Sequence, residues 1–377
     1  VPLIVGFGCN VPAIMASRTL ERENDRILTT VMSPFMSCGA RLTIYALFTA
    51  AFFPTGGQNI VFLLYLIGIL AALATGLLLK KTALKGEITP FIMELPPYRL
   101  PRLRDLFLLS WVRLKSFVFG AGRIIVMVVV VLSFLSSVGT DGTFGNENTG
   151  NSVLSSIGRA ITPVFAPIGM RKENWPAAVG LFTGIFAKEA VVGTLDSLYS
   201  ASDNTKGVAK GSQPLDLPGK LAAAVATIPQ NMAGLATAIT DPLGLTAAGP
   251  QKSLAEAAAA QQVKAGTFGA MVSRFDGRIG AFAYLLFILL YFPCLAALSA
   301  VANEAGRKWA AFAGLWSTSL AYFVSVSFYQ SATFFRHPLS SAGWIGLVVI
   351  LMSGFVWAMK KANNQSAAAH GALSVAE

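Results

Sequence analysis

Long apolar runs, several broken by glycine or proline, constrain this chain more than any other feature. Seven such runs lie at 34–53, 60–79, 117–138, 176–199, 281–301, 309–330 and 343–359. Each is close to the length of about 20 residues that crosses a bilayer as a helix. Charged residues make up only 12% of the chain, about half the share of a soluble domain. Because lipid satisfies no backbone hydrogen bonds, the sequence predicts an all-α, polytopic transmembrane helical bundle. A soluble protein with a large buried helical core is the alternative.

The distribution of basic residues predicts which loops are cytoplasmic. The loop over 80–116 carries eight basic residues against three acidic ones, so the positive-inside rule makes it cytoplasmic. Arg18, Arg22 and Arg26 lie two crossings earlier and belong on the same side. The turn over 54–59 has no Lys or Arg and fits the outside.

The later topology depends on the run over 176–199. If this run crosses fully, the tail that begins with Lys360 and Lys361 ends outside, against its charge. If it is re-entrant, the tail is cytoplasmic and the loop over 200–280 is outside. We favour the re-entrant arrangement. The segment over 102–115 mixes apolar and basic residues and predicts an interfacial helix or a helical loop. A helical run is expected near 253–264 in the Ala- and Gly-rich loop.

Two motifs near the N-terminus combine a cysteine with residues that break helices. The first, GFGCNVP at 6–12, holds Cys9 and Asn10, and the second, SPFMSCGAR at 33–41, holds Met36, Ser37 and Cys38. Broken helices at membrane depth form the ion sites of transporters, and thiolate sulfur suits a soft or borderline metal such as Fe(II). The alternative for each cysteine is a small side chain packed beside a glycine. Arg41 begins a span and is expected to reach the cytoplasmic surface.

Two further motifs place ionisable or thiol groups inside apolar runs. Lys188 and Glu189 lie mid-run in LFTGIFAKEAVVGTL, where charge is costly and indicates function. Because adjacent helical residues do not face each other, we expect the two not to pair together, and we expect a helix break near 183–184. A structural ion pair between helices is the alternative. In YFPC, Pro293 frees a carbonyl near Cys294, and Glu304 lies near the helix end, where a solvated carboxylate is the alternative to a pathway group.

Several classes of function lack their motifs. The three cysteines form no CxxC pair, and with His337 and His370 they make no recognisable zinc site. The sequence contains no G-x-x-x-x-G-K-[ST], no G-x-S-x-G and no H-E-x-x-H, so we expect no nucleotide hydrolysis by these residues and no catalytic residue. The net charge of +11 fits cytoplasmic loops better than nucleic-acid binding.

At these motifs the chain resembles the ferrous iron transport protein B (FeoB) family of bacteria and archaea. The resemblance runs over 1–359 and is carried by VPLIVGFGCNVPAIMASRTLE, SPFMSCGARL, FIMELPPYRLP, TPVFAPIG, ENWPAAVGLFTGIFAKEAVVGTL and LLYFPC. It implies a multi-pass protein of the bacterial inner membrane that carries Fe(II), with no permanently bound cofactor. The implied partners are the lipid bilayer, an N-terminal G domain with a spacer, small cytoplasmic Feo accessory proteins and a possible homo-oligomer, without nucleic acid. By resemblance, Cys9 and Cys38 touch iron; Asn10, Met36, Ser37, Lys188, Glu189, Cys294 and Glu304 remain pathway candidates from their own residue types.

The resemblance also divides the chain. It implies the end of a first gate motif over 1–20, two membrane helices and a basic loop over 21–116, and a second gate region over 117–199. An extramembrane loop over 200–280, three membrane helices over 281–359 and a tail over 360–377 follow. Because the chain opens on Val1, we expect a piece of a longer protein whose G domain and first membrane helices are absent here. Two other functions stay open: a nucleoside-gate-type solute carrier, and a non-transporting membrane anchor for a G protein.

Overall fold

The computed structural model describes residues 1–84, 102–147, 149–203 and 265–374, with a few isolated positions between 219 and 229. Over these residues the chain is helical apart from its connections and three isolated β-bridges. The expected helix near 253–264 and the motif FIMELPPYRLP at 91–101 lie outside the described residues. The all-α expectation is confirmed.

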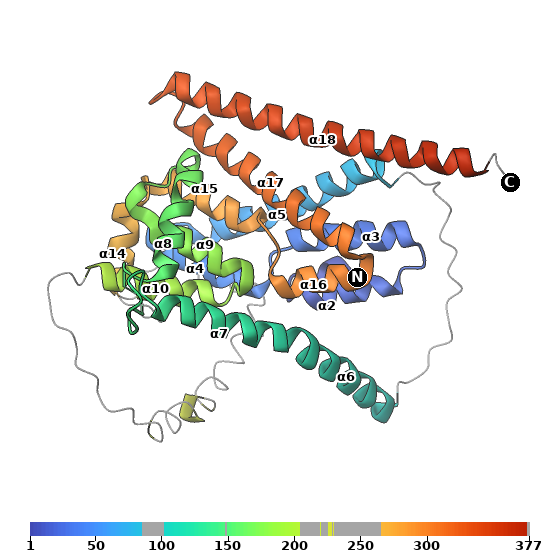
Figure 1. The fold of residues 1–377 in the computed structure, drawn as a ribbon, viewed down its shortest axis with the longest axis horizontal. Helices are drawn as coiled ribbons and strands as arrows, with labels where there is room; N and C mark the ends of the chain where they lie inside the picture. The colour runs from blue at the N-terminus through green and yellow to red at the C-terminus, as the bar shows by residue number, and fades with distance from the viewer. Residues whose placement is uncertain are drawn as a thin grey trace.

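The N-terminal part is a set of short and long helices joined by tight breaks (Figure 1). Helices α1 (Pro2–Val5) and α2 (Asn10–Ala16) are followed by α3 (Glu23–Met32), α4 (Gly39–Phe52) and α5 (Gly57–Thr82). Gly56 starts α5 with a φ of +82°, a left-handed conformation that favours glycine. This turn lets α4 and α5 pack as an antiparallel pair.

A long bent helix follows. Helix α6 (Leu103–Phe117) passes through a turn of π-helix (Val118–Gly122) into α7 (Arg123–Ser137). The helical reading of 102–115 is confirmed. Over 117–137 the chain stays helical through this π-helical turn, and Val126–Ser137 is a shorter apolar helix.

The second half begins with a compact helical group. Helix α8 (Val153–Ile161) leads through the 3-10 helices η4 (Thr162–Ile168) and η5 (Lys172–Asn174) to α9 (Trp175–Phe186) and α10 (Ala190–Asp203). Helices α14 (Ala265–Arg274), α15 (Gly277–Leu290), α16 (Leu295–Ala305), α17 (Arg307–Ala332) and α18 (Pro338–Ser374) complete the described chain.

The core lies where α4, α14 and α15 meet. Phe48, Phe275 and Tyr284 are buried and their rings contact one another, with centroids 5.0 to 5.5 Å apart. Aromatic rings at such distances add to the free energy of burial. This cluster therefore holds α4, α15 and the end of α14 together.

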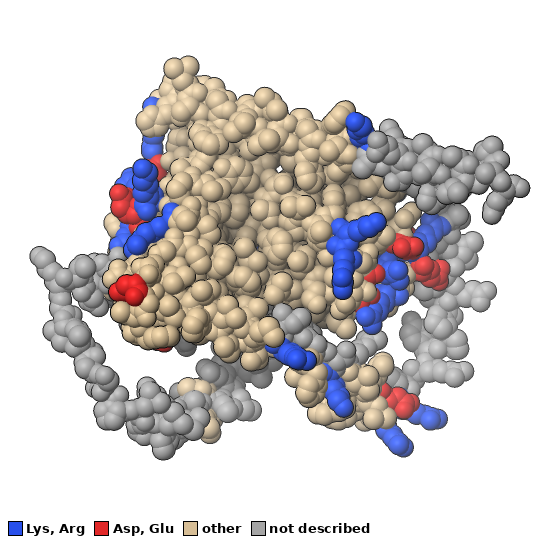
Figure 2. Space-filling view, viewed as in Figure 1, with Lys and Arg blue, Asp and Glu red and all other residues tan. Residues whose placement is uncertain are grey.

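Charged side chains gather mainly at two opposite ends of the molecule, with a broad band of other side chains between them (Figure 2). Five described segments are long and apolar enough to cross a membrane: Glu23–Phe52, Gly57–Thr82, Gly277–Ala305, Arg307–Ala332 and Pro338–Lys361. The chain is therefore a multi-pass membrane protein with its spans along the long axis of Figure 1.

The arrangement of the spans agrees with the charge of the loops. Figure 1 shows α3 and α17 beginning, and α5 and α18 ending, at the same end of the molecule. The basic pairs of the loops and tail belong to these helix ends: Lys80 and Lys81, Arg307 and Lys308, Lys360 and Lys361. Placing all of them on one side satisfies the positive-inside rule, as the re-entrant arrangement requires.

Candidate functional site

Four chain breaks interrupt membrane segments part of the way across. They lie between α1 and α2, between the 3-10 helix η2 (Ser33–Phe35) and α4, between α9 and α10, and between α15 and α16. Each leaves three or four residues outside the helices. Such breaks are tolerated in a membrane only where protein or water surrounds the backbone.

Every cysteine of the chain occupies the same structural position at one of these breaks. Cys9, Cys38 and Cys294 are the N-cap residues of α2, α4 and α16. Cys9 is exposed and the other two thiols are half-buried, and all three are free.

The first two breaks contact each other directly. The Gly39 backbone N–H donates to the Gly8 carbonyl at 3.3 Å, which places Cys9 and Cys38 beside the same hydrogen bond. The buried Asn10 amide, oriented as a donor, reaches the carbonyls of Gly6 and Ser33 at 3.1 and 3.2 Å. Asn10 therefore holds the first break against the second rather than pointing into open space.

The second break is held by a buried cation. Arg41 is fully buried, and its Nη1 donates to the carbonyls of Pro34 and Met36 at 2.8 and 3.1 Å. The expectation that Arg41 reaches the cytoplasmic surface is wrong, because the broken helix offers two unpaired carbonyls that the guanidinium satisfies. Ser37 is also buried, and its hydroxyl shares a hydrogen bond with Tyr45 at 3.3 Å.

The segment over 176–199 is a helical hairpin. Tyr199 near the end of α10 donates to Asn174 before the start of α9. Gly180 lies against Leu195, and Gly184 lies against Val191. These pairs run antiparallel along the two helices, so the chain enters and returns at one end, as the re-entrant arrangement predicts. The helix break expected near 183–184 is wrong in its position: α9 continues to Phe186, and the break falls at 187–189.

The tip of this hairpin rests on the fourth break. Lys188 is buried, and its Nζ lies 4.7 Å from the centre of the Tyr291 ring, three residues before Cys294. A cation over an aromatic face is attracted by the ring quadrupole. Glu189 is exposed at the tip, and the described residues show no ion pair between it and Lys188. The expectation that the two do not pair together therefore agrees with the geometry.

The breaks bring most of the candidate residues into one region. Cys9 lies close enough to Cys38, Cys294 and Glu189 to interact with them electrostatically. Lys188 is likewise close to Cys38 and Cys294. Within the described residues, no three His, Cys, Asp or Glu side chains come close enough to form a resident metal centre. The arrangement is a loose cluster of thiols at a junction, not a closed coordination cage.

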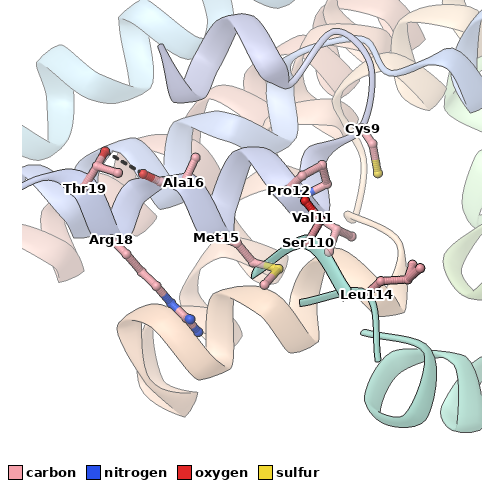
Figure 3. Close-up of a pocket in the computed structure, with 9 residues that line it drawn as sticks. All are labelled: Cys9, Val11, Pro12, Met15, Ala16, Arg18, Thr19, Ser110 and Leu114. Carbon is pink, nitrogen blue, oxygen red and sulfur yellow. Dashed lines mark hydrogen bonds between the residues drawn. The ribbon is translucent and has the colours of Figure 1, made fainter. Parts of the chain in front are cut away.

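A cavity of about 620 Å³ leads away from this cluster (Figure 3). Cys9 lies at one end of it, Val11 and Met15 of α2 line its middle, and Arg18 lies at the other end. Ser110 and Leu114 of α6 form the opposite wall. The cavity follows α2 from the first break towards the end of the molecule that carries the basic loops.

Glu304 lies outside the thiol cluster, beside the far end of that cavity. Its carboxylate is 4% exposed and accepts bidentate hydrogen bonds from Arg18 at 2.7 Å. The solvated helix end considered from the sequence is therefore wrong. Arg18 is not among the candidate residues from the sequence, and its partner lies 286 positions away along the chain.

Comparison with known proteins agrees with these features. A family model described as Nucleoside recognition, called Gate, matches residues 1–52 and 118–308, and one described as Ferrous iron transport protein B C terminus matches 61–113. The Fe(2+) transporter FeoB of Legionella pneumophila (strain Paris) is 49% identical over 92% of this chain and 44% of its own length. That of Salmonella typhi is 43% identical over 93% of this chain and 44% of its own length.

The chain thus spans less than half the length of the curated relatives it matches. No solved structure matches it. The Gate model alone covers more than half of the chain, and both gate segments contain chain breaks found here. By these matches the chain belongs to the FeoB family, as part of its membrane region.

Proposed function

We propose that this chain forms the membrane pathway of an Fe(II) transporter. The observation that carries the proposal is the meeting of four chain breaks with Cys9, Cys38 and Cys294 at helix N-termini. Thiolates suit Fe(II) better than Na⁺ or Mg²⁺, which prefer oxygen ligands. The relatives' name as Fe(2+) transporters supports the same cargo.

Charge explains why the thiols matter in this place. Arg41 and Lys188 are buried near the cluster, and a divalent cation would be repelled by both. Thiolates formed as the metal binds at Cys9, Cys38 and Cys294, together with the Glu189 carboxylate, offset that repulsion. On this account each ion that enters the cluster displaces thiol protons, because the thiolate is the form that binds metal.

The cavity along α2 provides a route from the cluster towards the basic end of the molecule. We place Asn10, Met36 and Ser37 as groups that hold the breaks together, because the first is tied to two backbone carbonyls and all three are buried. Glu304 acts with Arg18 at the far end of the cavity.

Regulation and partners belong to the same proposal. GTP acts through a G domain elsewhere in the full-length protein, and small Feo proteins and further copies of the chain are its partners. The bacterial inner membrane is the proposed location. The basic loop over 80–116 is the proposed docking surface for the G domain, and 85–101 of it lie outside the described residues.

The test is Fe(II) uptake by cells that make the full-length protein with single substitutions. Cys9→Ser, Cys38→Ser and Cys294→Ser are each expected to lower uptake at least about tenfold, since even outer partners of metal ligands contribute 10–100-fold. Met127→Leu is the matched control, because it removes an exposed sulfur of α7 that does not line the cavity. Unchanged uptake in all three cysteine variants, at equal protein levels, would overturn the thiol pathway.

A further inference from the structure

A groove follows α17 and α18 at the end of the molecule opposite to the basic loops. It consists of two cavities in sequence along η4, α17 and α18, with volumes of about 380 and 420 Å³. We name the two together the α17–α18 groove. Figure 1 shows the two helices meeting at that end of the molecule.

The outer cavity is polar and carries net positive charge. Asp276 accepts a hydrogen bond from Arg336 at 2.9 Å and another from Tyr329 at 2.9 Å, and Arg171 lies 3.7 Å away. Two guanidinium groups against one carboxylate leave a net charge of +1. Each arginine side chain is more than half exposed, 55% for Arg171 and 58% for Arg336. Their outer N–H groups are therefore open to a ligand.

The inner cavity is lined almost wholly by apolar and aromatic side chains. Phe165, Phe287 and Val348 form its buried floor, and Tyr322 closes one side by donating to the Val164 carbonyl at 2.9 Å. An apolar tail fits this lining, whereas a soluble ion has no partner there.

The dimensions match one leaflet of a bilayer. Trp344 lies at the polar end, where interfacial tryptophans are usual. From there to Phe355 at the apolar end, α18 advances 11 residues, or about 16 Å. Half of a hydrocarbon core is about 15 Å.

We propose that the α17–α18 groove binds one anionic phospholipid in the leaflet opposite to the basic loops. Its phosphodiester lies between Arg171 and Arg336, and one acyl chain lies along Phe165, Tyr322 and Phe287. A phosphate with a single negative charge complements the net +1 of the outer cavity, which favours anionic over zwitterionic lipid. This site is separate from the iron pathway and does not depend on the proposed cargo.

The test uses the full-length protein in nanodiscs or micelles, with bound lipid counted by native mass spectrometry. The probes are phosphatidylglycerol and phosphatidylcholine. Arg171→Gln with Arg336→Gln should weaken retention of phosphatidylglycerol about 30-fold, because two basic residues near the membrane surface are lost. Lys172→Gln with Arg278→Gln is the matched control, since both residues are exposed near the same cavity but do not line it.

Two further experiments distinguish binding of a lipid from binding of a soluble anion. Ser319→Phe narrows the apolar cavity while leaving both arginines, and it should also lower retention of phosphatidylglycerol. Inorganic phosphate should not displace the lipid. Equal retention in the arginine variant and its control would overturn the site, and full displacement by inorganic phosphate would show an anion site without a tail. Equal retention of phosphatidylcholine and phosphatidylglycerol would overturn the charge argument.

Discussion

A single methyl group at Gly184 should disturb the junction between the re-entrant hairpin and the fourth break. A Cβ at this position would collide with the Tyr291 hydroxyl and would lie 2.9 Å from Val191 Cγ2. Overpacking of this kind costs about 1–3 kcal/mol. Alanine regains up to about 1 kcal/mol over glycine in a helix interior. The variant Gly184→Ala should therefore lose up to about 2 kcal/mol of stability.

The hairpin supplies its own control. A Cβ at Gly193 meets no atom within 4 Å, so Gly193→Ala carries the helix gain without the collision. It should be neutral or stabilising by up to about 1 kcal/mol. The two variants of the full-length protein are compared by their unfolding midpoints in one detergent and by Fe(II) uptake. Gly184→Ala should lower both quantities and Gly193→Ala neither.

A second substitution tests the cause of the loss. Tyr291→Phe removes the hydroxyl that the new methyl group meets and keeps the ring beneath Lys188. In the Gly184→Ala background it should restore about 1 kcal/mol or more, although the contact with Val191 remains. The reasoning is refuted if Gly184→Ala behaves like Gly193→Ala, or if Tyr291→Phe brings no recovery.

Two other predictions concern contacts that hold distant segments together. Arg18→Ala leaves the buried Glu304 carboxylate without its bidentate partner and should destabilise by about 1–3 kcal/mol, below the cost of a fully buried pair because Arg18 is 61% exposed. Glu304→Gln should cost less, since the charge then left without its partner is that of the exposed Arg18, which water solvates; unfolding midpoints in the opposite order would contradict this. Trp316→Phe removes the hydrogen bond of 3.0 Å from the indole to the buried Thr75 hydroxyl and should cost about 1–3 kcal/mol. Thr75→Val in the Trp316→Phe background should recover part of that loss, and no recovery in thermal unfolding would count against the hydrogen bond.

Much of the fold could be predicted from the sequence, because membrane helices are specified by runs of apolar residues. The long apolar helices α5, α17 and α18 fall close to the expected runs. The re-entrant hairpin could also be predicted, since the charges of the flanking loops are incompatible with a full crossing. The exact break at 187–189 could not, because the Thr183 hydroxyl bonds to carbonyls of its own helix and Gly184 leaves space for the Tyr291 side chain, so both residues fit inside α9.

The candidate site was only partly predictable. Cysteines beside helix-breaking residues indicated three of the breaks. Each cysteine is an N-cap residue because a helix begins directly after the extended segment that contains it. The burial of Arg41 could not be predicted, because an arginine at the end of a span usually extends to the membrane surface. Here two backbone carbonyls of the break accept hydrogen bonds from its guanidinium. The pairing of Arg18 with Glu304 joins residues 286 positions apart, and no local pattern encodes such a contact.

The most direct test of the thiol junction is protection of the three cysteines by Fe(II) in the full-length protein. Alkylation rates of Cys9, Cys38 and Cys294 would be measured by peptide mass spectrometry in native membranes under anaerobic conditions, with Fe(II), with Mg²⁺ and without metal. A shared pathway predicts that Fe(II) slows alkylation of all three thiols with one concentration dependence, while Mg²⁺ does not. Alkylation that Fe(II) leaves unchanged, or that Mg²⁺ slows equally, would contradict the junction as the place where the ion crosses.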